Sequence, residues 1–347
     1  MVQDATATTN VTTKELVNNV LAAIDKERER EIISRRFGLF DRKETLEQIG
    51  EMLGITRERV RQLEKAVMSS LKATVEQGNI EEVSAFEERV VNLLQNHGQV
   101  SRITELTNQI TPSADREEQA RVAFLCQLCT GLVVINEDDN FYSSVGILAI
   151  HDEKTIKELV STLIETIKQI GEPKDIKTIA KAAKIEDPAR AAALASTSKQ
   201  LATLNSRWGL VKWPMVNPKN IRDKIYVILK ENGKHMHFNE IAAAIKGSDF
   251  KRKDVTTQAV HNELIKDKRF VLVGRGIYAL KEWGYNKGTV ADIITEVLKQ
   301  AGEPLHRDEI VKRVLKSRFV KETTILLNLQ GKSQFKRVAK ATYTLAE

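Results

Sequence analysis

The feature that most limits the fold of this chain is a pattern that occurs four times along it. In each copy an amphipathic stretch with helical spacing ends at a glycine, and a second helical stretch follows. The four glycines are 73, 62 and 69 residues apart, at Gly98, Gly171, Gly233 and Gly302. A repeat of this length in a chain of 347 residues predicts a series of small helical domains, not one large core.

Two short β-type runs complete each copy. In the clearest case, residues 269–273 and 277–280 flank the turn Gly274-Arg275-Gly276. Similar runs occur at 335–345 and up to Trp208-Gly209-Leu210. Three helices followed by a hairpin are typical of a winged helix. We therefore expect a mainly α-helical fold, with four tandem winged helices behind a separate N-terminal helix-turn-helix domain.

The third copy resembles the HARE-type winged helix, a fold also found in the delta subunit of Gram-positive RNA polymerase. The resemblance is best over residues 221–285, through GIYAL at 276–280 and Trp283, and it weakens toward the other copies. Asn217-Pro218 and the segment 284–288 have the composition of linkers. The expected domains are residues 1–80, 81–150, 151–217, 218–286 and 287–347.

Residues 44–72 carry the most specific local signal. Thr45 followed by Gln48 is a capping box, and the apolar residues that follow mark one face of a short helix ending at Gly54. Thr56 is a good N-cap for a second helix from Arg57 to about residue 72. Two helices joined by so short a turn form a helix-turn-helix.

The second of these helices has one apolar and one polar face. At about 100° per residue, Val60, Leu63, Val67 and Leu71 share one side, and Arg57, Glu58, Arg61, Gln62 and Lys65 share the other. Arg, Glu and Gln match the hydrogen-bonding edges of guanine, cytosine and adenine in the major groove. We predict that Arg57, Glu58 and Gln62 contact DNA bases; the alternative is an ordinary solvated face.

The same segment resembles region four of primary sigma factors over about residues 12–75. The matching runs are KEREREIISRRFGL at 26–39, TLEQIG at 45–50 and ITRERVRQLE at 55–64. The resemblance implies contacts of Arg57, Glu58 and Gln62 with bases of the −35 promoter element. It implies positions at or near the DNA backbone for Thr56, Arg59, Arg61 and Lys65. More loosely, it implies docking on the β-subunit flap of bacterial RNA polymerase through Ile32, Ile33, Phe37 and Leu39.

Only about a dozen residues precede this segment in the sequence. The sigma regions that bind the polymerase clamp, read the −10 element and melt DNA are therefore not expected. The loop at residues 38–42 is also shorter and less glycine-rich than is usual in that family. We expect a sigma-like recognition domain and not a complete sigma factor.

The net charge of +7 indicates a polyanionic partner, but the charge is unevenly distributed. Residues 74–152 carry 4 basic against 13 acidic residues. Because phosphate repels such a surface, we expect the first winged-helix copy to face protein, or to be simply a solubilising domain. In the third copy Lys251, Arg252, Lys253 and Arg275 are expected at the DNA backbone, with ordinary solvated charge as the alternative.

Composition also limits the cellular setting. No apolar run approaches the roughly 20 residues that cross a bilayer. The polar start at residues 1–10 does not look like a secretory signal. Cys126 and Cys129 are the only two cysteines, too few for a disulfide framework. These features predict a soluble cytoplasmic protein, at the nucleoid, without a membrane partner.

Several motifs are weaker than they first look. The spacing of Cys126 and Cys129 suits zinc or redox chemistry, but no second pair exists and apolar neighbours favour two core cysteines. The GxGxxA pattern at residues 274–279 lacks a following helix, and the P-loop-like segment 331–333 lacks its first glycine. His235 and His237 are expected at the surface or at a helix cap. We expect no enzyme, metal site, cofactor or small-molecule substrate.

Three functions remain open from the sequence. The first is a sequence-specific transcription regulator that reads a −35-like element in double-stranded DNA and contacts RNA polymerase. The second is a polymerase accessory protein, similar to delta, that reads little sequence itself. The third is an accessory protein for DNA modification or restriction, because HARE-type modules look like general DNA adaptors.

Overall fold

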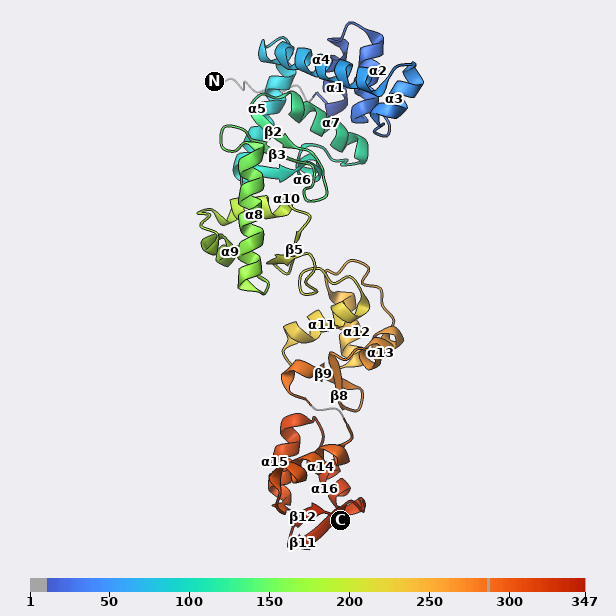
Figure 1. Cartoon of the computed structure of the whole chain (residues 1–347), viewed down its shortest axis with the longest axis vertical. Coiled ribbons are helices and arrows are strands. Elements are labelled where there is room, and N and C mark those ends of the chain that lie inside the picture. Colours follow the sequence, from blue (N-terminus) through green and yellow to red (C-terminus); the bar gives the residue numbers. More distant parts are fainter. Residues whose placement is uncertain (1–10, 286–287, 347) are drawn as a thin grey trace, which may run out of the picture. The chain divides into compact units, whose positions relative to one another are not determined.

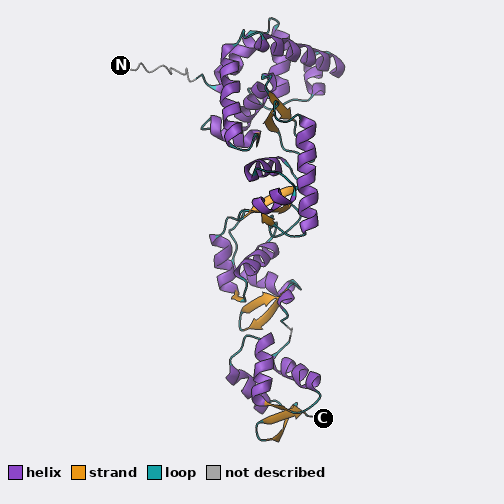
Figure 2. Cartoon of the chain, turned by 90° about the vertical axis from the view of Figure 1, so that its left-hand side faces the viewer, coloured by secondary structure: helices purple, strands orange, loops and turns teal. Residues whose placement is uncertain are grey.

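The computed structural model describes residues 11–285 and 288–346. The start at residues 1–10 and positions 286 and 287 of the expected linker lie outside the described residues. The described chain is mainly helical, with sixteen α-helices and four small antiparallel sheets (Figure 2). It divides into two compact units, one that ends at Val211 and one that begins at Lys212. None of its described helices combines the length and apolar character needed to cross a membrane.

The first four helices form the N-terminal helix-turn-helix region. They are α1 (Thr13–Ala22), α2 (Glu27–Phe37), α3 (Leu46–Leu53) and α4 (Arg57–Glu76) (Figure 1). The predicted capping box of Thr45 and Gln48 is confirmed, as is the predicted N-cap at Thr56, whose side chain accepts a hydrogen bond from Arg59 N. Helix α4 extends four residues beyond the predicted end because Val75 still has a core to pack against.

Four segments then share one order: helix, strand, helix, helix, strand, strand. The first consists of α5 (Glu81–Asn96), β1 (Val100–Arg102), α6 (Ile103–Ile110), α7 (Arg116–Leu128), β2 (Leu132–Ile135) and β3 (Ser144–Ile147). The second consists of α8 (Glu153–Ile170), β4 (Lys174–Asp175), α9 (Ile176–Ala182), α10 (Pro188–Thr197), β5 (Leu201–Leu204) and β6 (Arg207–Leu210). We call these the acidic module and the second module.

The other two segments belong to the second unit. The third module consists of α11 (Ile221–Asn232), β7 (Met236–His237), α12 (Phe238–Gly247), α13 (Thr257–Lys266), β8 (Phe270–Gly274), β9 (Ile277–Leu280) and the short 3₁₀ helix η1 (Lys281–Trp283). The fourth consists of α14 (Val290–Ala301), β10 (Leu305–His306), α15 (Arg307–Ser317), α16 (Glu322–Gly331), β11 (Phe335–Ala339) and β12 (Thr342–Leu345).

Each module contains a three-stranded sheet in which the last strand lies in the middle. The hairpins predicted at residues 269–280 and 335–345 are present, as is the strand that ends at Leu210. The sequence did not reveal the first strand of each sheet, such as β7, where Met236 pairs with Tyr278. Strands of two or three residues are too short to show the alternation from which strands are predicted.

One apolar core joins the helix-turn-helix region to the acidic module. It contains Val20 and Leu71 from the first part together with Val90, Phe124 and Val145 from the second. Helix α7 contacts α1, α2 and α4, as Figure 1 also shows. The chain up to residue 80 therefore shares its core with the residues that follow.

The acidic and second modules also pack closely. At Gly98, which has φ +88°, an added Cβ would lie 2.6 Å from Ala189 O in α10. Phe141 and Ser198 form a β-bridge between the modules, and Lys199 Nζ lies 2.7 Å from Glu137 Oε1. A side chain at position 98 would push α10 away, so this contact accounts for the glycine.

His151 is buried at the same junction. Its Nδ1 lies 3.4 Å from Arg190 Nη2, and its Nε2 has no hydrogen-bond partner among the described residues. Burial lowers the pKa of His151 below its ordinary value of 6.5, with a further contribution from Arg190 and an opposing one from Asp152. The neutral imidazole is therefore the form that this junction favours.

We predict that acid weakens this junction. Because the pKa of His151 is lower in the folded chain, the folded state binds fewer protons than the unfolded state. The contribution of His151 to the free energy of unfolding therefore has its full value above about pH 6.5 and decreases as the pH falls below that value. Hydrogen exchange should show faster exchange of α8 and α10 at pH 5.5 than at pH 7.5, and His151→Gln should reduce the difference. An equal pH response in both proteins would contradict the prediction.

Candidate nucleic-acid interface

Helix α4 is held by a small core of its own. Ile32, Ile49 and Val60 are buried together, with the partly buried Leu46 and Leu63 around them. At Gly50 an added Cβ would lie 2.7 Å from Ile55 O, so the α3–α4 turn can close tightly only over a glycine. The predicted apolar face of α4 is thus confirmed, and its other face is exposed.

The side chains of the exposed face form two groups of polar contacts. Arg57 Nη1 lies 3.2 Å from Oε1 of Glu47, a residue that no sequence pattern singled out. Arg61 donates two hydrogen bonds to Glu58, from Nε to Oε2 at 2.8 Å and from Nη2 to Oε1 at 2.7 Å. Gln62 Nε2 donates to Glu58 Oε1 at 3.3 Å. The three predicted base-contacting residues therefore lie together on one face.

Thr56, Arg59 and Lys65 are exposed on or beside this face. Arg59 donates weakly to Gln62 Oε1, at 3.5 Å. The hydrogen bonds from Arg61 lower the pKa of Glu58, and those to Glu58 raise the pKa of Arg61. The Glu58 carboxylate is therefore ionised at neutral pH and can only accept hydrogen bonds, as a cytosine amino group requires. The predicted DNA contacts of these residues remain predictions.

The four residues expected at the polymerase flap are not at the surface. Ile32, Ile33 and Leu39 are at most 1% exposed, and the half-buried Phe37 packs on Phe124 of α7 with 5.0 Å between ring centroids. In this structure these side chains form the cores that join α2 to its neighbours, and their contact with polymerase remains a prediction. Ile33, Leu39 and Phe37 pack in the core shared with α7, whereas Ile32 packs with Ile49 and Val60 of α3 and α4.

Arg121 of α7 completes this contact. Its Nε donates to Leu39 O at 2.8 Å, its guanidinium lies over the Phe40 ring, and it pairs with Glu117 and Glu118. Glu118 also accepts a hydrogen bond from the Thr13 hydroxyl. An arginine within the apolar run of α7 was the one signal in the sequence that could have indicated this contact.

Several acidic side chains of the acidic module have partners within the first unit. Asp115 and Asp138 accept backbone hydrogen bonds, Glu87 accepts one from Gly131 N, and Glu137 pairs with Lys199. These contacts use carboxylates that the sequence analysis assigned to a protein-facing surface. The excess negative charge thus has a structural use, and the expected docking role remains a prediction.

The third helices of the first two modules are used for packing. Helix α7 is buried against the helix-turn-helix region, and α10 packs on β1 of the acidic module. Helix α13 of the third module differs, because Gln258, Asn262 and Lys266 are exposed on it. Of these three helices, α13 is the one with a polar face open to a ligand such as DNA.

The basic loop before α13 is exposed and held in place. The buried Lys224 donates from Nζ to Lys251 O at 2.8 Å and to Arg252 O at 2.7 Å. Arg252 adopts a left-handed backbone with φ +54°. Lys251, Arg252, Lys253 and the turn residue Arg275 are exposed, as phosphate contacts require. Nothing in the sequence distinguished Lys224 from an ordinary surface lysine.

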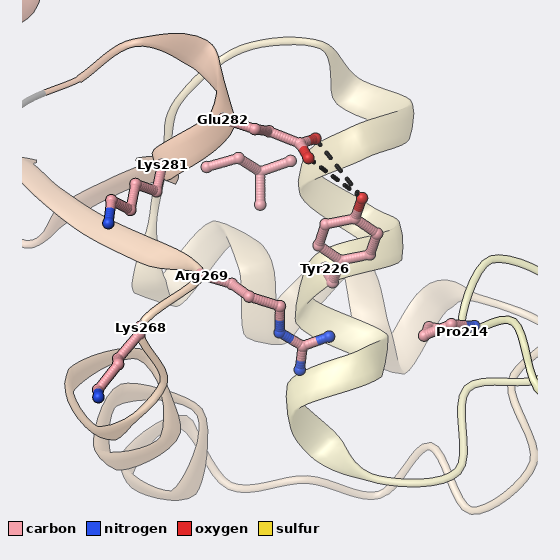
Figure 3. A pocket seen from close by; sticks show the side chains of 7 residues that line it. Pro214, Tyr226, Lys268, Arg269, Lys281 and Glu282 are labelled. Atoms are coloured by element: carbon pink, nitrogen blue, oxygen red, sulfur yellow. Dashed lines mark hydrogen bonds between the residues drawn. The ribbon is translucent and has the colours of Figure 1, made fainter.

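The third module also has an open hollow of about 670 Å³ (Figure 3). It lies at the open end of the β8–β9 hairpin, whereas Arg275 lies at the turn of that hairpin. Two charged side chains of the hollow, Arg269 and Glu282, form ion pairs with neighbouring residues. The Tyr226 hydroxyl lies 3.5 Å from both carboxylate oxygens of Glu282, and Arg269 pairs with Asp267 and Asp223. Lys268 and Lys281 point away from the tyrosine in Figure 3. The two ion pairs of Arg269 make it a poor candidate for a phosphate contact.

The cysteine pair lies in the core. Cys126 and Cys129 are buried free thiols, and burial raises the pKa of both. The interpretation of these residues as core cysteines is confirmed. Among the described residues, no group of histidine, cysteine and carboxylate side chains has an arrangement that could hold a metal ion.

Comparisons with known proteins single out the same segment. Residues 26–73 match the family model Sigma-70, region 4. A 46-residue stretch is 52% identical to the RNA polymerase sigma factor sigB of Arabidopsis thaliana, covering 13% of this chain and 8% of that protein. The sigma factor SigA of a Bacillus species is 43% identical over 60 residues, 17% of this chain and 16% of SigA.

RpoS of Coxiella burnetii is 41% identical over 68 residues, 19% of each protein. The chain therefore matches less than a fifth of the length of these sigma factors. The match makes residues 26–73 similar to sigma region four and points to a DNA-binding role related to transcription by RNA polymerase. The match to the family model ends at residue 73, before the first of the four modules begins.

We predict that Arg121 stabilises the joint between α7 and the helix-turn-helix region. Arg121→Met leaves Leu39 O and the Glu118 carboxylate without this donor and should lower the unfolding free energy by about 1–3 kcal/mol. Hydrogen exchange should become faster in residues 33–40. The exposed Arg116 on the same helix is the matched control, and an equal effect of Arg116→Met would contradict the prediction.

Proposed function

We propose that this protein is a sequence-specific DNA-binding regulator of transcription that reads a −35-like promoter element through α4. The proposal is supported chiefly by one observation. Arg57, Glu58 and Gln62 are exposed together at the N-terminal end of a helix whose sequence is similar to sigma region four. This end of a recognition helix is the part that reaches base edges in the major groove.

The four modules are proposed to be tandem winged helices, in agreement with their shared element order and sheet topology. The third, proposed to be of the HARE type, would hold the DNA backbone without reading sequence through Lys251, Arg252, Lys253 and Arg275. The acidic module and the second module would act mainly as a rigid support. On this proposal the protein works at the nucleoid in the cytoplasm, without catalysis.

RNA polymerase is proposed as the protein partner. A contact with its β-subunit flap through Ile32, Ile33, Phe37 and Leu39 would require the packing around α2 to rearrange, because these apolar side chains are buried or half-buried. This burial favours a second candidate: a polymerase accessory protein that contacts the enzyme elsewhere. Co-purification of the tagged full chain, with identification of bound proteins and sequencing of bound DNA, separates the two candidates. Promoter fragments recovered without polymerase would favour direct reading.

We predict that Arg57→Ala costs about 1–3 kcal/mol of binding free energy on the preferred site and relaxes the preference at one base pair. The cause is loss of the bidentate contact that an arginine makes with guanine. Selection of binding sites from random duplexes by the full chain measures this. Replacing Arg57, Glu58 and Gln62 together should abolish the motif, and an unchanged motif would exclude base reading by this face.

A separate prediction concerns the third module. Replacing Lys251, Arg252, Lys253 and Arg275 by alanine in the full chain should weaken binding to all DNA sequences alike. The slope of the logarithm of the binding constant against the logarithm of the salt concentration should become less steep, by up to about one for each phosphate that the variant no longer neutralises. Binding measured from about 50 to 200 mM salt tests this. An unchanged slope would remove the third module from the DNA-binding surface.

A further inference from the structure

The Arg61–Glu58 pair carries an inference that rests on the proposed function and refines it. The two side chains are both more than half exposed, so nothing around them forces the contact. They nevertheless meet in a bidentate arrangement, with both carboxylate oxygens engaged by one guanidinium. Such a fork fixes the plane of the carboxylate as well as its distance.

We propose that Arg61 is a positioning residue for base recognition: its guanidinium orients the Glu58 carboxylate toward the base that Glu58 reads. This role replaces the position at the DNA backbone that the sigma resemblance implied for Arg61. Arg61 would influence specificity at a base pair that it does not itself contact.

The remaining acceptor positions on Glu58 fit this role. An ionised carboxylate can accept about four hydrogen bonds. Arg61 supplies two of the three donors present, and Gln62 supplies the third through its longer contact with Oε1. One position on Oε2 stays open for a base amino group, and a second opens when Gln62 turns to a base of its own.

The ion pair is compatible with contact to DNA. A carboxylate that enters the groove alone has no partner to offset its loss of water and is repelled by the phosphates, whereas the attraction of a paired guanidinium offsets part of both costs. Without a cation beside it, Glu58 would be a poor group to place in a field of negative charge. Arg61 offsets that repulsion and leaves an acceptor position on Glu58 open for a base.

Other residues are available for the phosphate contacts. Lys65 lies one turn further along α4, is exposed, and has no ion pair or hydrogen bond within the described chain. Its ammonium group is therefore free to meet a phosphate. The two cations of one helix face thus have different surroundings, and they should respond differently to substitution.

Arg61→Lys distinguishes a positioning role from a phosphate contact. Lysine keeps the charge, so a phosphate contact would survive, but it cannot form the bidentate fork. We expect the full-length Arg61→Lys protein to lose about 5- to 100-fold of its preference at the base pair read by Glu58. The salt slope of its binding should equal that of the wild type, and its melting temperature should not change.

A double-variant comparison completes the test. Once Glu58→Ala has removed the carboxylate, adding Arg61→Lys should change the selected motif no further. Lys65→Ala is the matched control, expected to lower the salt slope by about one and to leave the motif unchanged. Selection from random duplexes and salt-dependent binding, both with the full chain, supply the readouts.

The outcomes are distinct. If the wild type selects no motif, the proposed function fails and this inference fails with it. If the wild type selects a motif and Arg61→Lys selects the same one, base reading stands and the positioning role is wrong. A salt slope that falls by about one in Arg61→Ala, with the motif unchanged, would return Arg61 to the DNA backbone.

Discussion

The packing of α7 against the helix-turn-helix region is the contact on which the first unit depends. Phe124 fills the space beside Phe37, and Arg121 crosses to the backbone of Leu39. The four helices at the start of the chain bury few apolar side chains by themselves, and a core of that size is marginal. The acidic module supplies the missing apolar surface, so α4 is held in place partly by residues far along the sequence.

This dependence explains what sequence patterns could and could not predict. The caps at Thr45 and Thr56 and the apolar face around Val60 are local, and local signals predicted them correctly. Burial of Leu39 depends on contacts with residues some 80 positions away, which no periodicity encodes. The first strand of each sheet, such as β7, was invisible because it exists only by pairing with a strand 40 residues later.

In the candidate site, too, some features could be predicted from the sequence and others could not. A helical wheel placed Arg57, Glu58 and Gln62 on one exposed face, because the spacing of 3.6 residues per turn determines that arrangement. It could not predict that Arg61 turns toward Glu58 instead of outward, or that Glu47 of the preceding helix meets Arg57. Those choices depend on side-chain rotamers. The role of Lys224 beneath the basic loop depends on tertiary contacts in the same way.

Helix α4 has a mechanical consequence of its own. It has 20 residues and is therefore about 30 Å long. Its first turns carry the candidate recognition face, and its last turns, with Leu71 and Val75, are embedded in the core shared with the acidic module. One unbroken rod thus joins the two places, with no hinge between them. A rotation or shift of the acidic module would therefore move the N-terminal end of α4, and any DNA bound there, by a corresponding amount.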